Sequence, residues 1–220
     1  MFRHGKPVRA IAVLTDGKTL ISGAEDGLVR VWDITTLKMR SVLDKGSTTR
    51  TLKNEPIYCL AISPDGSVLA CGDADGQLAS WDLSRAKLRA IMSCGPHPSS
   101  VLSVAFSGDG RTLAAGCMSG PVRLFDVASG KEKETVGKNW NPAWAVSFTP
   151  DGQKLLAGIN DGAVEIWHLA DHKEGGALTT KRGYVTSLVF TPDGKKLITG
   201  HGNIYNDSDI PGVIGIWDFP

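Results

Sequence analysis

The stretch DGLVRVWD at residues 26–33 recurs almost letter for letter as DGQLASWD at residues 75–82. Three looser copies follow: SGPVRLFD at 119–126, DGAVEIWH at 161–168 and GVIGIWD at 212–218. One such stretch would indicate only a strand behind a tight turn. Several copies in register indicate a repeat architecture, because self-similarity at a fixed period is typical of chains built from one supersecondary unit.

An Asp-Gly pair precedes each copy and sets the period. The Asp residues lie 49, 44, 42 and 42 residues apart, at Asp16, Asp65, Asp109, Asp151 and Asp193. In the first four units an aromatic residue follows by 16 positions: Trp32, Trp81, Phe125 and Trp167. In the fifth, Trp217 follows by 24, because an eight-residue insertion lies within residues 201–212. We therefore divide a single domain, 1–220, into units of about 1–43, 44–92, 93–136, 137–179 and 180–220.

Each unit carries the signals of four short strands. The first strand precedes the Asp-Gly turn, and its first buried position recurs as Val8, Ile57, Val101, Ala143 and Val185; Ile11 and Val13 continue the buried side in the first unit. The second strand ends at a glycine: Gly23, Gly72, Gly116, Gly158 and Gly200. The third is the repeated stretch itself, and a weaker fourth follows, as in KMRSVL at 38–43. One set of four short antiparallel strands corresponds to one blade of a β-propeller. Because the set recurs about every 44 residues, we predict an all-β chain of about five blades with essentially no helix.

The closing Trp-Asp pair, the SPDG turn at 63–66 and the period together resemble the WD-repeat family of β-propellers, over the whole chain. In that family a histidine, a serine or threonine of the second strand, an Asp before the third strand and the Trp form a buried hydrogen-bonded chain. The resemblance implies such a chain in the first unit, which alone has all four residues: His4, Ser22, Asp26 and Trp32. The other units depart from the pattern and are expected to depend more on apolar packing.

The count of strands leaves the closure of the ring open. The fifth unit stops after its third strand, so the units supply five sets of three inner strands and only four outer strands. The last blade is therefore expected to lack its outer strand. Three arrangements are compatible with this count. They are a fragment of a larger propeller, which in this family most often has seven blades, a lone five-bladed ring with one three-stranded blade, and an oligomer or larger chain that completes the ring.

The composition narrows the partners and cofactors. The net charge is +1 and 41% of the residues are hydrophobic, which favours neither nucleic acid nor a membrane as a partner. The apolar runs are too short for a membrane span or a secretory signal, so we expect a cytoplasmic location. The four cysteines form no CxxC pair and no Cys/His cluster with metal spacing. We therefore expect no metal, no cofactor and buried thiols.

Function is expected where the repeats differ, because variable positions on an exposed rim carry the identity of the partner. Two kinds of position should lie on one face near the central channel: those that flank the first buried residue, and the residue before the third-strand Asp. The candidates are Arg9, Glu25, Tyr58, Leu102, Met118, Trp144 and Tyr184. Aromatic residues, Met and Arg are enriched in interface hot spots. Packing against neighbouring blades is the competing interpretation of Tyr58 and Trp144.

We therefore predict a noncatalytic scaffold that presents this rim to a protein or peptide partner. The sequence has no GxSxG elbow, Walker loop or HExxH motif. The alternatives are a propeller enzyme, a hydrolase or lyase with residues at the central channel, and the repeat or sensor part of a larger multidomain protein. The insertion at 201–212, with Asp207 and Asp209, is a further candidate for a protruding contact loop.

Overall fold

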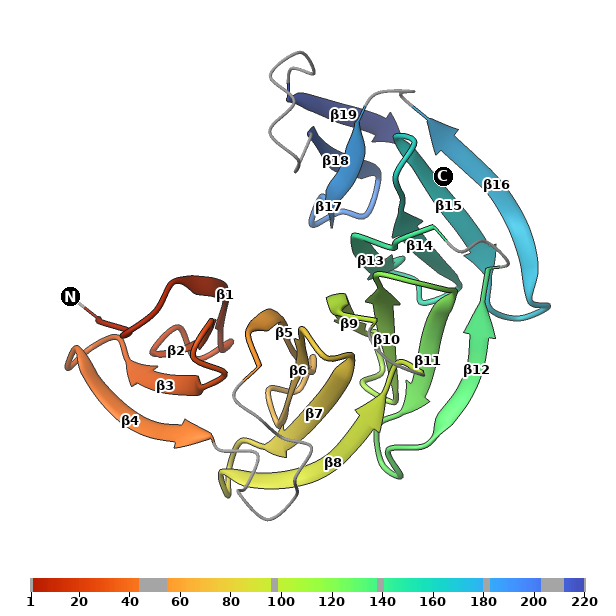
Figure 1. Cartoon of the computed structure of the whole chain (residues 1–220). Helices are drawn as coiled ribbons and strands as arrows, with labels where there is room; N and C mark the ends of the chain where they lie inside the picture. The colour runs from red at the N-terminus through yellow and green to blue at the C-terminus, as the bar shows by residue number, and fades with distance from the viewer. Residues whose placement is uncertain are drawn as a thin grey trace.

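Five β-sheets lie side by side along an open arc (Figure 1). The structure is a computed structural model of the 220-residue chain, and it describes residues 2–43, 55–95, 99–137, 141–179, 183–202 and 212–219. The regular elements in these ranges are all β-strands. Each sheet is one blade, whose first strand lies on the inner side of the arc and whose last strand lies on the outer side (Figure 1).

The strands follow one another in chain order across every blade, and neighbours are antiparallel. Blade 1 comprises β1 (Val8–Val13), β2 (Thr19–Ala24), β3 (Val29–Asp33) and β4 (Lys38–Leu43). Blade 2 comprises β5 (Ile57–Ile62), β6 (Val68–Asp73), β7 (Gln77–Asp82) and β8 (Lys87–Ser93). Blade 3 comprises β9 (Val101–Phe106), β10 (Thr112–Cys117), β11 (Val122–Asp126) and β12 (Glu132–Val136). Blade 4 comprises β13 (Ala145–Phe148), β14 (Lys154–Gly158), β15 (Ala163–His168) and β16 (Lys173–Thr179), and blade 5 comprises β17 (Tyr184–Phe190), β18 (Lys196–Gly202) and β19 (Val213–Asp218).

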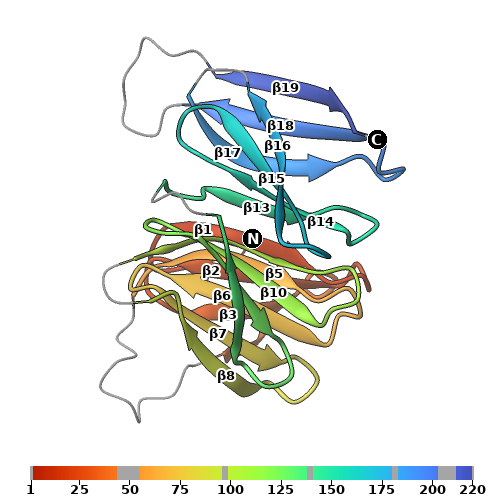
Figure 2. The ribbon, with the colours of Figure 1, turned by 90° about the vertical axis from the view of Figure 1, so that its right-hand side faces the viewer.

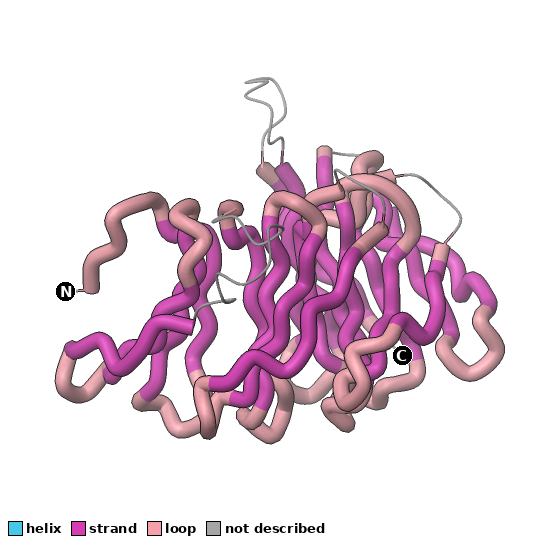
Figure 3. Tube along the Cα trace, turned by 60° about the horizontal axis from the view of Figure 1, so that its bottom comes forward, coloured by secondary structure: helices cyan, strands magenta, loops and turns pink. Residues whose placement is uncertain are grey.

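The predicted all-β propeller is confirmed, including a fifth blade of three strands within the described ranges. The lone closed five-bladed ring is not what forms. Blades 1 and 5 are the two ends of the arc and stand apart (Figures 1 and 2). The strands run in roughly one direction, and their turns gather at two ends of the molecule (Figure 3). Residues 203–211, with Asp207 and Asp209 of the predicted contact loop, lie outside the described residues.

The Asp-Gly turns connect the first and second strands of each blade. In blade 2, Gly66 has a φ of +73°, a left-handed conformation that glycine adopts without strain. The Asp65 carboxylate closes the turn by accepting the Ser63 hydroxyl at 2.5 Å and the Ser67 backbone N–H at 3.0 Å. These hydrogen bonds stabilise the charged form and lower the pKa of Asp65 from 3.8 to about 2. An equivalent hydroxyl bond recurs in three further turns, at Asp109, Asp151 and Asp193.

Neighbouring blades pack through two chemically different faces. We call the side of a blade that carries the aromatic residue of the third strand its tryptophan face, and the opposite side its aliphatic face. That aromatic residue is Trp32, Trp81, Phe125, Trp167 or Trp217 in blades 1 to 5. At the first junction the aliphatic face of blade 1 packs against the tryptophan face of blade 2. The buried residues there are Ile21, Val29 and Val31 of blade 1 and Leu69, Cys71 and Trp81 of blade 2. The same polarity repeats at the three following junctions.

Junctions are fixed by a close approach between a glycine and the first buried side chain of the next blade. Ile57 of blade 2 packs on Gly23 of blade 1, and Val185 of blade 5 packs on Gly158 of blade 4. A Cβ placed on Gly23 would lie 2.5 Å from Ile57 Cγ2, and one on Gly158 would lie 2.6 Å from Val185 Cγ1. Carbon atoms cannot pack so closely without a clash. A larger residue at these positions would therefore push the blades apart.

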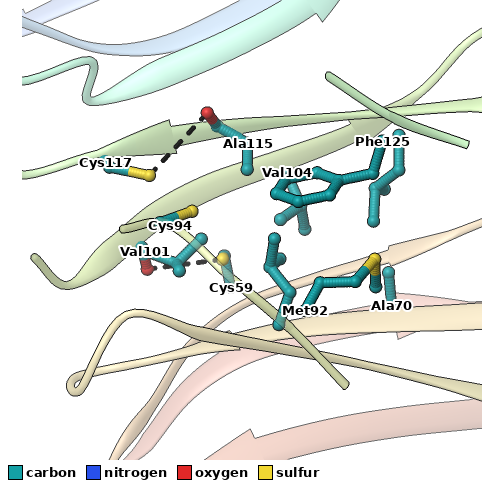
Figure 4. Packing of buried hydrophobic residues seen from close by; sticks show 11 residues of the cluster. Cys59, Ala70, Met92, Cys94, Val101, Val104, Ala115, Cys117 and Phe125 are labelled. Atoms are coloured by element: carbon teal, nitrogen blue, oxygen red, sulfur yellow. Dashed lines mark hydrogen bonds between the residues drawn. The ribbon is translucent and has the colours of Figure 1, made fainter. Parts of the chain in front are cut away.

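The junction between blades 2 and 3 shows this packing from close by (Figure 4). Phe125 and Val104 of blade 3 lie against Met92 of blade 2 in one buried cluster. All four cysteines are buried as thiols, as the sequence predicts. The Cys59 thiol donates a hydrogen bond to the Val101 carbonyl oxygen at 3.5 Å, across the junction. Burial raises the pKa of Cys59 well above its ordinary value, so this thiol stays protonated.

One part of the predicted core is exposed. The sequence places Val8, Ile11 and Val13 on a buried side, but they are 45%, 67% and 53% exposed. At the position equivalent to Val8, Ile57 and Val101 are 0% exposed. The physical reason is that β1 presents these side chains at the end of the arc, where no further blade packs on blade 1 within the described structure.

We predict that acid weakens the fold through the Asp-Gly turns. Because the pKa of Asp65 is about 2 in the folded chain and ordinarily 3.8, the folded state binds fewer protons between these values. The stability that this carboxylate contributes is present above about pH 4 and is lost as the pH falls towards about 2. Asp65→Asn should therefore lower Tm at about pH 6, and the difference should shrink at about pH 2. Thermal melts of both chains measure it, and a difference of the same size at both pH values would contradict it.

Candidate functional site

The predicted binding residues lie at one end of the molecule. The Asp-Gly turns that join first and second strands, such as Asp65-Gly66, lie at the opposite end. Because neighbouring strands are antiparallel, the turns between second and third strands lie at the first of these ends together with the starts of the first strands. We call this end the rim. Backbone hydrogen bonds join its two components in three blades: Glu25 N–H to the Pro7 carbonyl at 2.9 Å, Ala74 to Pro56 at 3.0 Å and Met118 to Ser100 at 2.9 Å.

A β-bulge in the first strand redirects side chains at the rim. The pairing with the second strand skips Arg9 in β1, Tyr58 in β5 and Leu102 in β9. A bulged residue leaves the regular alternation of its strand, which re-aims its side chain. In β17 the skipped residue is Thr186, whereas the predicted Tyr184 pairs with Gly202 at the start of the strand. Blades 1, 2, 3 and 5 thus present a bulged residue at an equivalent place.

The rim holds two groups of interacting side chains. In blade 1 the Arg9 Nε donates to the Glu25 carboxylate at 2.8 Å, within an ion pair. At the junction of blades 4 and 5 the Trp144 indole N–H donates to the Asn160 amide oxygen at 2.6 Å. The ring of Trp144 also meets that of Tyr184 edge-on, with centroids 5.7 Å apart. The remaining candidates belong to the intervening blades 2 and 3: Tyr58, Leu102 and Met118.

The position of Trp144 is compatible with both interpretations that the sequence left open, packing against a neighbouring blade and binding a partner at the rim. Its contact with Tyr184 crosses a blade junction, as a packing role requires. The side chain is nevertheless only half-buried, so part of its ring remains accessible at the rim. Asn160, which holds the indole, is not one of the seven binding candidates. The sequence nevertheless places it on the same face, because it is the residue before the third-strand Asp, as are Glu25 and Met118 in their units.

The hydrogen-bonded chain in blade 1 takes a route that the sequence does not predict. The Trp32 indole N–H donates to the Ser22 hydroxyl oxygen at 2.6 Å, and His4 Nε2 lies 2.6 Å from the same oxygen. His4 Nδ1 accepts from Arg30 at 2.6 Å, and Arg30 pairs with Asp26 at 2.8 Å. Asp26 therefore reaches His4 through Arg30. Burial, and then the Arg30 charge, lower the pKa of His4, which keeps Nδ1 able to accept.

The other blades keep only parts of this chain. In blade 5 the Trp217 indole N–H donates to the Thr199 hydroxyl at 3.1 Å, and buried His201 lies 2.7 Å from that hydroxyl. His201 thus occupies the histidine's role from a different place in the repeat, which the family pattern does not reveal. In blade 2, Cys71 stands where blade 1 has Ser22. Among the described residues the buried Trp81 indole N–H has no hydrogen-bond partner.

Most carboxylates with a lowered pKa lie at the end opposite the rim. Asp26 lies at the rim, but the others occupy Asp-Gly turns or the turns after third strands, where hydroxyls, backbone N–H groups and basic side chains stabilise their charge. We therefore assign these carboxylates a structural role in the turns. Two grooves of about 440 and 310 Å³ lie beside these turns. Within the described ranges, no group of three or more His, Cys, Asp or Glu residues is placed to hold a metal ion, and no helix is long and apolar enough to cross a membrane.

Two protein-family models match the chain. The model described as Nucleolar protein 10-like, N-terminal domain, matches residues 43–203, which extend from the end of blade 1 into blade 5. The model described as WD domain, G-beta repeat, matches residues 1–33, which include the first three strands of blade 1. No curated protein matches the chain.

We predict that Asp26→Ala lowers the free energy of unfolding by about 1–3 kcal/mol, because half-buried Arg30 loses its carboxylate partner. Urea or thermal melts measure the loss. Asp75→Ala is the matched control, since Asp75 holds the equivalent position in blade 2, where Ala79 replaces Arg30. Equal losses in the two variants would show that the position acts through its turn alone.

We predict that Cys71→Ser stabilises blade 2 by about 1 kcal/mol, because the new hydroxyl would accept the Trp81 N–H as Ser22 accepts that of Trp32. Cys71→Ala is the control, since it removes the thiol without adding an acceptor. The measurement is Tm, and a serine variant no more stable than the alanine variant would count against the interpretation.

Proposed function

Because the chain belongs to the WD-repeat β-propellers of the Nucleolar protein 10-like N-terminal domain family, we propose that it is a noncatalytic scaffold that binds a protein or peptide on its rim. WD-repeat propeller domains commonly serve as platforms for protein interaction. The observation that carries the proposal is the recurrent bulge, which gives Arg9, Tyr58 and Leu102 equivalent positions at one end of the arc.

The chemistry of the rim supports a partner with apolar anchor residues. Arg9 and Glu25 are the charged members of the proposed binding set, and they pair with each other, so the set offers no unpaired charge to a polyanion. Tyr58, Trp144 and Tyr184 offer large rigid surfaces, and such side chains contribute strongly to binding because they lose few rotamers. The binding surface that we propose is therefore the set predicted from the sequence: Arg9, Glu25, Tyr58, Leu102, Met118, Trp144 and Tyr184.

The same proposal covers the organisation and location of the chain. We treat 1–220 as one propeller domain, which is compatible with a place as the repeat part of a larger multidomain protein. Neither nucleic acid nor a membrane is a proposed partner. A cytoplasmic location remains the prediction from sequence, and the competing one is nucleolar, because the matched family is named after a nucleolar protein. Fluorescence microscopy of the tagged protein separates the two.

The test is selection of peptides from a phage-displayed random library on the purified chain. We expect selected peptides to bind the rim, so that Tyr58→Ala weakens them about tenfold or more with little change in Tm. Trp144→Ala should also weaken binding, but it removes the contact with Tyr184 and should lower Tm as well. Binding is measured by calorimetry and folding by thermal melts.

Ile91→Ala is the control, because Ile91 is an exposed apolar residue of β8, the outer strand of the same blade, on the opposite edge of the sheet from Tyr58 of β5. Peptides that respond equally to Ile91→Ala and Tyr58→Ala would not be rim ligands. If every selected peptide behaved in this way, the rim would not be the binding surface.

A further inference from the structure

The Asp-Gly turns of neighbouring blades touch at three of the four junctions between the described blades. The residue before the Asp of one turn reaches the glycine of the turn in the next blade. A Cβ placed on that glycine would lie 3.8, 3.6 and 3.2 Å from it in the pairs Thr15 with Gly66, Pro64 with Gly110 and Pro150 with Gly194, respectively. In two of these pairs a proline ring therefore fills the space in front of the glycine.

The junction of blades 3 and 4 lacks this contact. Gly108 stands where the other turns have a threonine or a proline. A Cβ placed on Gly152 would lie within 4 Å of no described residue beyond its chain neighbours. The groove of about 440 Å³ is lined by both glycines, together with the apolar residues Leu124, Phe148 and Leu169. The missing side chain thus leaves an apolar groove at the end of the molecule opposite the rim, and we call it the Gly108 groove.

Two ionised carboxylates border the Gly108 groove, Asp109 and Asp151. Asp109 Oδ1 accepts the Ser107 hydroxyl at 2.6 Å, and Asp151 Oδ1 accepts the Thr149 hydroxyl at 2.5 Å. These hydrogen bonds lower the pKa of both carboxyls below the ordinary 3.8, so both are charged at neutral pH. Neither Oδ2 makes a hydrogen bond with the part of the chain that the structure describes. One oxygen of each carboxylate is therefore available to a ligand.

The cations nearby leave this negative charge largely uncompensated. The charged residues that line the Gly108 groove are one lysine and three carboxylates: Lys133, Asp109, Glu134 and Asp151. Lys133 Nζ donates to the Thr112 hydroxyl at 3.1 Å, and Glu134 Oε2 lies 2.6 Å from His172 Nδ1. Arg111 lines the neighbouring groove, and Lys154 Nζ lies over the ring of Phe219, 5.1 Å from its centroid. The Gly108 groove thus combines apolar residues with a negatively charged edge.

We propose that the Gly108 groove is a second docking surface, which binds an extended segment of a partner protein through a proline ring next to a lysine or arginine. The ring packs on Gly152 and fills the space that Pro64 and Pro150 fill in front of the glycines of the flanking junctions. The adjacent basic side chain pairs with the Oδ2 atoms of Asp109 and Asp151. The same carboxylates repel an acidic segment or a nucleic acid. This binding does not depend on the rim.

The test selects peptides on the full chain from two phage-displayed libraries. Both display peptides of about ten random residues around a fixed proline, which is flanked by Lys or Arg in one library and by Asp or Glu in the other. We expect the basic library to yield peptides that bind Gly108→Pro about tenfold or more weakly than the parent chain. The acidic library should yield no such peptides. Replacing the fixed proline of a selected peptide by alanine should weaken binding about tenfold as well.

Gly108→Pro fills the groove without disturbing the fold. The φ of Gly108 is not positive, and Pro64 and Pro150 hold the equivalent position in other blades, so proline fits this turn. The variant should raise Tm by about 1–4 °C, because proline restricts the unfolded chain and its ring packs on Gly152. Loss of binding by a more stable chain cannot result from unfolding. Gly108→Thr, which copies Thr15 of blade 1, is the second variant that fills the groove and should weaken the same peptides.

Matched variants separate the charge effect from the turn and from the rim. Asp151→Asn should weaken the selected peptides about two- to fivefold, the usual effect of an exposed ion pair. Asp193→Asn changes the equivalent turn of blade 5, so it should lower Tm by a similar amount and leave binding unchanged. Tyr58→Ala at the rim should also leave binding unchanged. Calorimetry measures binding and thermal melts measure stability.

Three results would overturn the proposal. The first is that Gly108→Pro and Gly108→Thr bind every selected peptide as tightly as the parent chain does. The second is that the acidic library yields peptides sensitive to Gly108→Pro as readily as the basic library. The third is that Tyr58→Ala weakens the selected peptides as much as Gly108→Pro, since the binding would then belong to the rim.

Discussion

The contact between a glycine at the end of one second strand and the first buried side chain of the next blade sets the geometry of the whole arc. A Cβ at Gly23 or Gly158 would fall within 2.5–2.6 Å of a side-chain carbon of the following sheet. The sheets can approach this closely only where that Cβ is absent. Close approach then brings the tryptophan face of one blade onto the aliphatic face of the blade before it, and the buried clusters follow from that contact.

The same three residues of the first strand connect this packing to the proposed function. In blade 2, Ile57 points to Gly23, Tyr58 is bulged at the rim, and Cys59 pairs with Gly72 of its own blade. The bulge lets consecutive residues serve the junction and the rim, because it breaks the alternation that a regular strand would impose. The junction residue must stay apolar and compact, whereas the bulged residue is more exposed, as Tyr58 is at 36% against 0% for Ile57. This explains why Ile57 and Val101 resemble each other, while Arg9, Tyr58 and Leu102 do not.

Most of the fold could be predicted from the sequence because its signals are local and repeated. Every unit contains the same signals: an Asp-Gly turn, alternation in the third strand and a glycine at the end of the second strand. The five copies therefore support one another. Burial of Val8, Ile11 and Val13 could not be predicted in this way, since it depends on a neighbouring blade and not on the residues themselves.

The route of the hydrogen-bonded chain through Arg30 could not be predicted from the sequence either. A family pattern names the four partners but not a fifth residue that inserts between two of them. At the rim, register could place Trp144, but its contacts with Asn160 and Tyr184 depend on side-chain directions that register does not give.

The hydrogen-bonded chain of His, Ser or Thr, Asp and Trp is kept in some blades and lost in others, and the packing between blades gives a physical explanation. Blade 1 keeps Ser22 and blade 5 keeps Thr199, whereas the equivalent residues of the three internal blades are Cys71, Ala115 and Ala157. A buried hydroxyl is tolerated only while its partners are present, and replacing a whole polar set by apolar groups of similar shape costs little. In blades 3 and 4 the alanines lie in junction clusters with Phe125 and Trp167, so apolar contact has taken over from hydrogen bonding. Blade 2 is an intermediate case, with an apolar Cys71 beside a Trp81 that still carries its N–H. Blade 1, whose tryptophan face is covered by no other described blade, keeps the whole polar chain. Blade 5 keeps the Trp217–Thr199–His201 part of it, although blade 4 packs on its tryptophan face.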